Sequence, residues 1–416
     1  MSLRDPNYTL CVSRLTSEPV VVRSPKPTHV PDHHILIRVD RFAFSANNIT
    51  NQVLAEHPHF RHKTHGVLPF WGFATVIKSS HSKIEVGERL LGFFAPTRYL
   101  VLPLSDVGEV SMYIPRPHLP ADRSIFSKVV RCKSDPAYQP FTEDLMMLYR
   151  PLFWASYWCE DWLSCSDYRG NCENLLVSSA SSKTGYLFAY CARNADRDIR
   201  LIGLTSKKHV SFTKHLGLYD EVYDYDTFLT TKTFQSNPGR KWIYVDVNGN
   251  AALTTKIHKH FSSDYTGTLA ASISLGLATK SPIVAWEQQL ALDAQLGADP
   301  TLEPNFHVMG QKSSCANDPD IWPQREQFFT PEWLAVRKKQ MDPTEICALA
   351  KSEWSRLVQD CQGWVEMEQV YGIDGVVKAY ERILHGDVAP DKGLIWSLWD
   401  QEAQVQADNM MYQTRL

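Results

Sequence analysis

The sequence has neither a surplus of charge of one sign nor a long apolar stretch. Lysine and arginine number 43 against 46 aspartate and glutamate residues, so the formal net charge is −3. This balance gives no reason to expect a nucleic acid or a membrane surface as a partner. No run of about 18 apolar residues occurs, and the first residues, MSLRDPNYTL, lack an apolar signal core. We therefore expect a cytoplasmic protein.

Paired cysteines are also lacking. The nine cysteines form no CxxC pair, and the intervals between Cys159, Cys165 and Cys172 match no common zinc pattern. Their odd number and irregular spacing favour free thiols in a reducing compartment over a disulfide framework. The histidine-rich stretch HPHFRHKTH (57–65) is more typical of a polar loop, with a metal site as the alternative. We expect no bound metal.

Glycine is scarce at the place where a nucleotide-binding turn needs it. The stretch NLLVSSASSKTGYLFAYCAR (174–193) has the order strand, tight turn and helix that is typical of phosphate binding. The two glycine positions of a P-loop hold Val177 and Ser182, which argues against a nucleoside triphosphatase. Only Gly185 stands at a glycine position of a dinucleotide-binding turn, where it lets helix and strand pack closely.

Hydroxyl groups take the place of the missing glycines. Serine side chains and the amides at the start of the helix could donate hydrogen bonds to a pyrophosphate, and a lysine adds a cation beside it. The candidate cofactor-binding residues of this turn are Ala180, Ser181, Ser182, Lys183, Thr184 and Gly185. The alternative is a buried strand followed by an ordinary turn.

The end of the next strand favours one cofactor over another. NAD-binding proteins place an acidic residue about 20 residues after the turn, where it binds the ribose hydroxyls. Here LIGLTSKKH (201–209) supplies Thr205, Ser206, Lys207 and Lys208 instead of a carboxylate. Hydroxyls and cations suit a 2′-phosphate, so NADP(H) is favoured over NAD(H). Solvated surface lysines are the alternative.

The order of apolar segments predicts an α/β chain with a β-rich first part. Strand-like runs cover 35–39, 70–80 and 88–104, and a helix is predicted over 142–163. Strands and helices then alternate, which indicates a parallel sheet with crossover helices. Near the end we expect a sixth strand at 304–310, a loop over 311–330, helices over 331–361 and 363–386, and a strand at 393–399.

Five stretches are similar to segments of one known superfamily. RFAFSANNIT (41–50) is similar to its Ala-x-Gly-x-Asn turn, with Ala43, Ser45 and Asn47 in register. The other four are WGFATVIKSSHSKIEVGERLLGF (71–93), KHLGLYDEVYDY (214–225), VDVNGN (245–250) and GVVKAYERILHGDVAPDKGLIW (375–396). The chain thus resembles the medium-chain dehydrogenase/reductase superfamily, particularly its zinc-free quinone and enoyl reductase branch. The match looks nearest to a quinone-reductase-like family whose hallmark is AFSANN.

This resemblance implies a domain organisation. It consists of a GroES-like β domain over 1–140, a Rossmann domain with a doubly wound parallel sheet over 141–310, and a segment over 311–416 that returns to the first domain. Trp71-Gly72-Phe73 stands where the Gly-His-Glu of zinc alcohol dehydrogenases would be, so catalytic zinc is not expected.

The resemblance also implies site residues. Asn47 would donate to the substrate or the nicotinamide ribose, with Asn48 and Asn51 as weaker candidates; the alternative for each asparagine is a turn-stabilising role. Tyr157, in the aromatic stretch 153–162, would line a substrate pocket unless these rings are plain core. Tyr225 would lie near the adenosine phosphate, and Asn248 near the nicotinamide ribose.

Two classes of function follow. The first is an NADPH-dependent oxidoreductase that reduces an activated alkene, quinone or ketone in natural-product metabolism, with a hydrophobic small-molecule substrate. The alternative, motivated by the missing glycines, is a lyase, isomerase or cyclase on the same scaffold, or a binding protein that has lost catalysis. A homodimer, which is common in the superfamily, is a further expectation.

Overall fold

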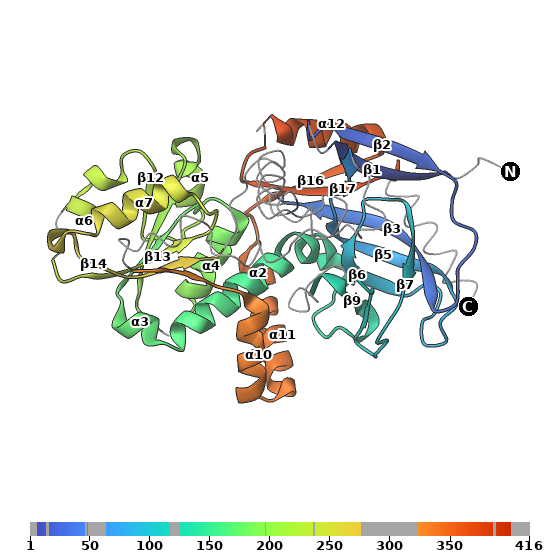
Figure 1. The fold of residues 1–416 in the computed structure, drawn as a ribbon, viewed down its shortest axis with the longest axis horizontal. Coiled ribbons are helices and arrows are strands. Elements are labelled where there is room, and N and C mark those ends of the chain that lie inside the picture. The colour runs from blue at the N-terminus through green and yellow to red at the C-terminus, as the bar shows by residue number, and fades with distance from the viewer. Residues whose placement is uncertain are drawn as a thin grey trace, which may run out of the picture. The chain divides into compact units, whose positions relative to one another are not determined.

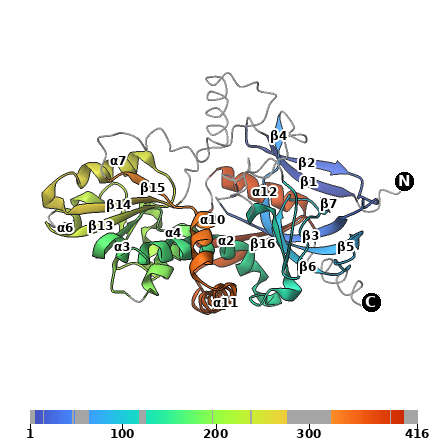
Figure 2. The same ribbon diagram turned by 60° about the horizontal axis from the view of Figure 1, so that its bottom comes forward.

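The chain folds into two units in the computed structural model, shown in Figures 1 and 2. The structure describes residues 6–13, 16–45, 48, 64–116, 125–195, 197–235, 238–275, 323–385 and 388–400. The first unit comprises Met1–Leu148, Lys280–Phe306 and Cys347–Leu416, and the second comprises Tyr149–Thr279 and His307–Ile346.

The first unit is built mainly of antiparallel strands. Its strands are β1 (Asn7–Ser13), β2 (Pro19–Ser24), β3 (His34–Phe44), β4 (His65–Gly66), β5 (Phe70–Ser79), β6 (Arg89–Phe94), β7 (Tyr99–Pro103), β8 (Ser111–Tyr113), β9 (Lys128–Arg131), β16 (Glu366–Tyr371) and β17 (Lys392–Ser397). They form a three-stranded sheet in the order β2-β1-β4 and a larger sheet in the order β16-β17-β3-β5-β6-β9-β8, in which β7 also pairs with β3. Helix α12 (Ile373–Leu384) connects the parallel strands β16 and β17.

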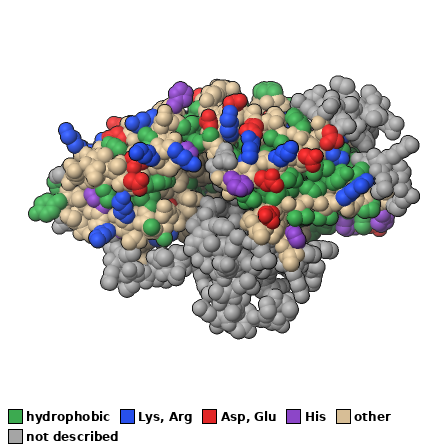
Figure 3. Space-filling model, turned by 90° about the horizontal axis from the view of Figure 1, so that it is seen from above, with side chains coloured by type: hydrophobic (Ala, Val, Ile, Leu, Met, Phe, Trp, Pro, Cys, Tyr) green, Lys and Arg blue, Asp and Glu red, His purple; other side chains and the backbone are tan. Residues whose placement is uncertain are grey.

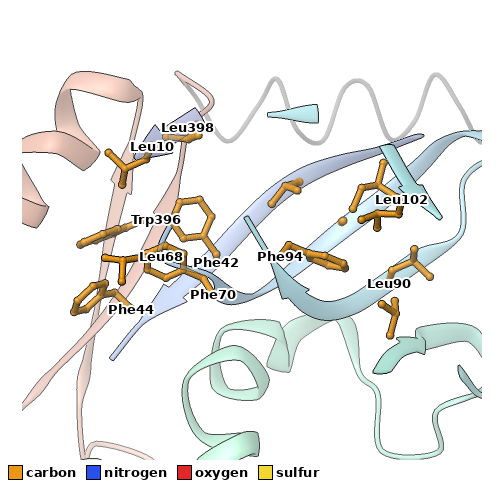
Figure 4. Packing of buried hydrophobic residues seen from close by; sticks show 14 of the residues in the cluster. Leu10, Phe42, Phe44, Leu68, Phe70, Leu90, Phe94, Leu102, Trp396 and Leu398 are labelled. Carbon is orange, nitrogen blue, oxygen red and sulfur yellow. The ribbon is translucent and has the colours of Figure 1, made fainter. Parts of the chain in front are cut away.

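Aromatic side chains from both ends of the sequence make the core of this unit. Trp396 of β17 is fully buried and stacks on Phe44 of β3, with ring centroids 5.0 Å apart. Phe42 packs on Phe70 of β5 at 4.8 Å, and these residues lie together in Figure 4. Burial of an aromatic side chain of this size contributes about 2 kcal/mol or more. The C-terminal segment therefore returns to the β-rich unit, and its last strand completes the core.

A network of buried charges lies on the other face of the larger sheet. Asp40, which is fully buried, accepts hydrogen bonds from Arg38 Nε at 2.6 Å and Thr75 Oγ1 at 2.8 Å and pairs with Arg89. Arg89 Nε also donates to Glu143 at 2.8 Å, and Arg41 pairs with Glu143 at 3.0 Å. Glu143 begins the long helix α2 (Glu143–Ser164), where the helix dipole favours a negative charge. The network thus ties the start of α2 to the sheet.

The second unit contains an all-parallel sheet of six strands. These are β10 (Asn174–Val177), β11 (Arg200–Thr205), β12 (Glu221–Asp224), β13 (Lys241–Asp246), β14 (Thr268–Ser274) and β15 (Arg325–Gln327), in the order β12-β11-β10-β13-β14-β15. The helices after α2 in this unit are α3 (Asp167–Asn171), α4 (Lys183–Arg193), α5 (Val210–His215), α6 (Lys232–Gln235), α7 (Ala251–His260) and α10 (Thr330–Gln340). Helix α11 (Pro343–Asp360) begins in this unit and continues into the first from Cys347. Its short 3₁₀ helices are η6 (Lys207–His209), η7 (Phe228–Thr230) and η8 (Asp264–Thr266), while η4 (Cys132–Ser134) and η5 (Pro140–Thr142) belong to the first unit.

Three expectations about the last third of the chain need correction. The sixth strand is β15, inside the stretch that we expected to be a loop, while 304–310 lies outside the described residues. The predicted helix over 363–386 consists of strand β16 followed by α12. The boundary between the second unit and the returning segment also differs from the expected position at 310. Strand β15 and helix α10 belong to the second unit.

Figure 3 shows one face of the molecule, on which the described residues form no large field of one charge. Acidic and basic side chains are mixed on the face shown in Figure 3, as the small net charge leads one to expect. Across the described part of the chain, none of the helices combines the length and the apolar character that a membrane crossing requires.

The buried charge network makes a testable prediction about pH. Burial would raise the pKa of Glu143, but hydrogen bonds and charge from Arg89, together with the charge of Arg41, hold it below its usual value. Since the folded-state pKa is lowered, the stabilisation is present above the unfolded-state pKa of about 4.3 and is lost as pH falls through the folded value. We expect Glu143→Gln to cost about 3 kcal/mol of unfolding free energy at pH 7 and less at pH 3, measured by urea denaturation.

The matched control is Glu345→Gln, since Glu345 is exposed and lies in the first turn of another helix. It should change the unfolding free energy by less than about 0.5 kcal/mol at either pH. Equal effects of the two substitutions, or a loss at Glu143 that does not depend on pH, would contradict the prediction.

Candidate functional site

The order of strands in the parallel sheet defines where a ligand can bind. From β10 the chain builds the sheet outward in one direction, through β11 to β12. It then returns to the other side of β10, where β13 begins the second half of the sheet. In open parallel sheets, ligands bind at the carboxyl ends of the strands where the order reverses. The candidate site is therefore formed by the segments that follow β10, β11 and β13.

The turn after β10 contains a residue with a positive φ, as glycine-rich turns do, although glycine is mostly absent. Ser179 has a positive φ of 50°, which glycine normally supplies. Gly185 lies so close to this turn that a Cβ atom there would overlap the carbonyl oxygen of Ser179. The one glycine that the sequence keeps is thus the one that close packing requires.

Helix α4 begins directly after the turn and can bind an anion. The Ser182 hydroxyl accepts from the amide of Gly185 at 3.1 Å and caps the helix. The amides of Lys183 and Thr184 come earlier in the first turn, where backbone donors have no acceptor within the helix. These donors and the positive end of the helix dipole are the groups that hold a phosphate, and the Lys183 side chain is half-buried beside them. Ala180, in the turn itself, is buried.

Three of the predicted hydroxyl residues meet at the end of β11. Thr205 Oγ1 donates to Ser181 Oγ at 2.8 Å, and both residues are buried. Ser206 Oγ lies 3.0 Å from Nδ1 of His209, which is also 3.4 Å from Ser181 Oγ. Sequence reasoning missed His209, although it closes the same stretch, two residues after Lys207. This group, Ser181, Thr205, Ser206 and His209, is called the hydroxyl cluster below.

Cations lie beside the hydroxyl cluster, and the nearby carboxylate is used by its own turn. Lys207 and Lys208 are exposed in η6. Asp224 is the register partner of Thr205 on β12, but it accepts hydrogen bonds from the amides of Asp226 and Thr227 at 2.9 and 3.0 Å. Hydrogen bonds from Thr227, led by its hydroxyl, lower the pKa of Asp224. Asp224 therefore stays ionised, but its oxygens are held by the turn that follows β12, whereas Lys207 and Lys208 extend into solvent.

Tyr225 links the turn to the second strand. Its hydroxyl accepts from the amide of Ser179 at 3.0 Å, and its own amide donates to the carbonyl of Thr205 at 3.0 Å. Burial raises the pKa of the phenol, so the hydroxyl stays protonated and can donate in turn. Tyr225 thus stabilises Ser179, the residue of the turn that has a positive φ.

A buried carboxylate lies at the carboxyl end of β13. Asp246, at the end of β13, accepts from Ser178 Oγ at 3.0 Å and pairs with Arg325 of β15 at 2.7 Å. The amides of Asn248 and Gly249 also point to Asp246, at 3.3 and 2.9 Å, while the Asn248 side chain is exposed. Asp246 was visible in VDVNGN, but its role was missed, and no sequence signal pointed to Arg325.

The predicted catalytic residues are only partly described. Asn47 and Asn51 lie outside the described residues. Asn48 is buried, accepts from the amide of Ser45 at 2.7 Å and donates to the carbonyl of Pro69 at 2.8 Å. Its side chain is thus used in the turn-stabilising role that the sequence analysis gave as the alternative.

Tyr157 lies on α2 among other aromatic rings. It is half-buried and packs edge-on against Trp154 and Trp158, with centroids 5.8 and 5.2 Å apart. A substrate-lining role for Tyr157 stays a prediction.

The close approach at Gly185 gives a second test. Gly185→Ala should destabilise the protein by about 1–3 kcal/mol, because the new methyl group overlaps a backbone oxygen that cannot move without breaking the turn. Thermal unfolding of the purified variant measures this loss. Gly108→Ala is the control, since its Cβ would meet only one atom, at 3.4 Å. A Gly185 variant as stable as this control would refute the steric argument.

Comparison with known structures shows the same fold in other proteins. CurA from Vibrio vulnificus superimposes with a TM-score of 0.54 at 14% identity over 95% of this chain and 99% of that one, and its complex with NADPH gives 0.54 at 16% identity with the same coverage. A candidate NADPH:quinone reductase from Bacillus thuringiensis gives 0.52 at 15% identity over 94% and 99%. The predicted α/β class, a GroES-like β-rich domain with a Rossmann domain, is confirmed.

Sequence comparison gives the family. No curated protein matches the chain with significant similarity. A family model described as "Protein of unknown function (DUF2855)" matches residues 42–389, which is most of the sequence. The chain therefore belongs to the DUF2855 family.

Proposed function

We propose that the protein is an NADP(H)-dependent oxidoreductase. The observation that carries the proposal is the hydroxyl cluster with Lys207 and Lys208 beside it, at the end of β11, where residues 205–208 include no Asp or Glu. Similar folds include a CurA structure solved in complex with NADPH and a candidate NADPH:quinone reductase. The turn after β10 supports a dinucleotide, because Ser179 has a positive φ and Gly185 allows helix α4 to start close to the turn.

The residues of this chain would share the binding of the coenzyme. The amides at the start of α4 and the Lys183 side chain would hold the pyrophosphate, and Ser182 would keep the helix end in position. Ser206 and Lys207 would bind the 2′-phosphate, since a hydroxyl donates and the ammonium group balances its charge. Thr205, whose buried hydroxyl donates to Ser181, would support this edge from behind. Tyr225 would position the turn rather than contact the reacting atoms.

The bound coenzyme would supply a hydride, and the protein would supply orientation and charge stabilisation. We propose an activated alkene, quinone or ketone as the acceptor. Reduction of such a compound builds negative charge on oxygen, which neutral amide and hydroxyl donors stabilise. Asn47 is proposed as one donor. The non-redox alternative keeps the same scaffold and does not need NADPH.

Coenzyme titration separates the two functions. Purified protein should bind NADPH with a micromolar or lower Kd, followed by nicotinamide fluorescence. At a hundredfold excess over Kd, bound NADPH should raise the unfolding free energy by about 2.7 kcal/mol, seen as a higher melting temperature. Absence of binding at millimolar NADPH would exclude the reductase and favour the non-redox alternative.

Lys207→Glu tests the assignment of the 2′-phosphate. The substitution places a carboxylate beside a dianionic group, so the Kd for NADPH should rise about tenfold or more while the Kd for NADH changes little. Lys259→Glu, an equally exposed charge reversal on α7, should leave both values unchanged. Equal losses for NADPH and NADH at position 207 would remove the 2′-phosphate from this edge of the sheet.

A further inference from the structure

One arginine of the first unit lacks the partners that arginines normally have. Arg116 Nη2 donates to the carbonyl of Phe93 at 2.8 Å, but Nη1 is buried and has no hydrogen-bond partner. Among the described residues, no carboxylate pairs with this guanidinium. Burial lowers the pKa of Arg116 to about 10, so the side chain remains charged at neutral pH. A buried donor without an acceptor costs stability, which makes this group a candidate for binding something.

The other arginines that lie inside this unit show how unusual Arg116 is. Arg38 and Arg89 pair with Asp40, and Arg131 pairs with Glu88 at 2.6 Å. Arg98 donates twice to the carbonyl of Leu398, at 3.0 and 2.8 Å. These four arginines of the first unit are thus compensated by a carboxylate or a carbonyl, whereas Arg116 has a buried donor without an acceptor.

One aromatic ring lies near this guanidinium, and two further rings pack against that ring. The central carbon of the guanidinium lies 5.9 Å from the ring centroid of Phe93, which packs between Trp71 at 5.4 Å and Phe126 at 5.1 Å. Phe93 is buried, whereas Trp71 and Phe126 are partly exposed and Ile125 beside them is 46% exposed. The amide of Ile114 donates to Ser127 at 2.8 Å and so holds the segment of Arg116 beside that of Phe126.

This cluster is separate from the core of the unit. Side chains alternate across a strand, so Trp71 and Phe93 point away from the face on which their neighbours Phe70 and Phe94 enter the core. Trp71 and Phe93 are also register partners on β5 and β6, which places their rings side by side. An apolar aromatic surface next to an unpaired cation is the result.

We propose that Arg116, Trp71, Phe93 and Phe126 form a binding site for the carboxylate of a planar, apolar acid. A guanidinium presents a planar fork that matches a carboxylate, and the rings would contact the flat hydrocarbon part of the ligand. A single cation without a second positive partner suits a monoanion. The site lies within the first unit and does not require the coenzyme. Its test is therefore independent of the proposed reductase activity.

The wild-type protein alone gives the first test. Cinnamate and its neutral amide, cinnamamide, have the same planar skeleton and differ in charge. Isothermal calorimetry without coenzyme should show that cinnamate binds about tenfold tighter or more, because only the carboxylate completes the guanidinium. Equal binding of the two compounds, or no binding of cinnamate at millimolar concentration, would overturn the proposal.

Arg116→Gln gives the second test. The variant should bind cinnamate about 10- to 100-fold more weakly and cinnamamide as before, which would abolish the preference. Its melting temperature should be unchanged or higher, since an uncompensated interior charge has been removed. A structural role for Arg116 predicts the opposite change in melting temperature.

The control is Arg23→Gln, which removes an exposed arginine from β2. It should leave both the preference for cinnamate and the melting temperature as in the wild type. Retention of the preference by Arg116→Gln would refute the site, and failure of that variant to fold would assign Arg116 to the fold instead.

Discussion

The close contact between Gly185 and the turn after β10 is the constraint on which the second unit depends. Because Gly185 has no side chain, α4 can start against the carbonyl of Ser179 and point its first amides at the crevice. Tyr219 fixes the same contact from the other side, since its hydroxyl donates to the carbonyl of Gly185 at 2.9 Å. Gly203 on β11 adds room, because a Cβ there would lie 2.9 Å from Ala180. The position of the donors at the start of α4 follows from this packing.

Serine in place of glycine at position 179 raises the conformational free energy of the turn. A left-handed conformation at a residue with a Cβ costs about 1–2 kcal/mol. The hydrogen bond from the Ser179 amide to Tyr225 offsets part of that cost, and the hydroxyl cluster adds polar groups that glycine cannot offer. A glycine turn lets a ligand approach the backbone, whereas this turn presents side-chain oxygens. Both solutions place donors at the start of a helix.

Much of the fold could be predicted from the sequence, because apolar periodicity marks the buried strands and the capped helices. The run Leu175–Val177 and the serine before Lys183 located β10 and α4 almost to the residue. Apolar periodicity does not mark a strand that is short or polar. Strand β15 is Arg-Glu-Gln, and β16 contains glutamates that also suit a helix. For the site, residue types suggested Thr205 and Ser206, but the roles of His209, Asp246 and Arg116 depend on neighbours distant in sequence. A missing partner, as at Arg116, leaves no trace in a local pattern.

Trp396 packs against aromatic residues from the first part of the chain, and this has a consequence for synthesis on the ribosome. The strands β3 and β5 emerge early, yet their aromatic core is closed only when β17 arrives about 300 residues later. The strands from β10 to β14 are contiguous in the chain, so the nucleotide-binding sheet can assemble first while Phe42, Phe44 and Phe70 still face solvent. Translation at about 5–20 residues per second leaves this apolar surface uncovered for at least 15 seconds, long enough for a chaperone to occupy it.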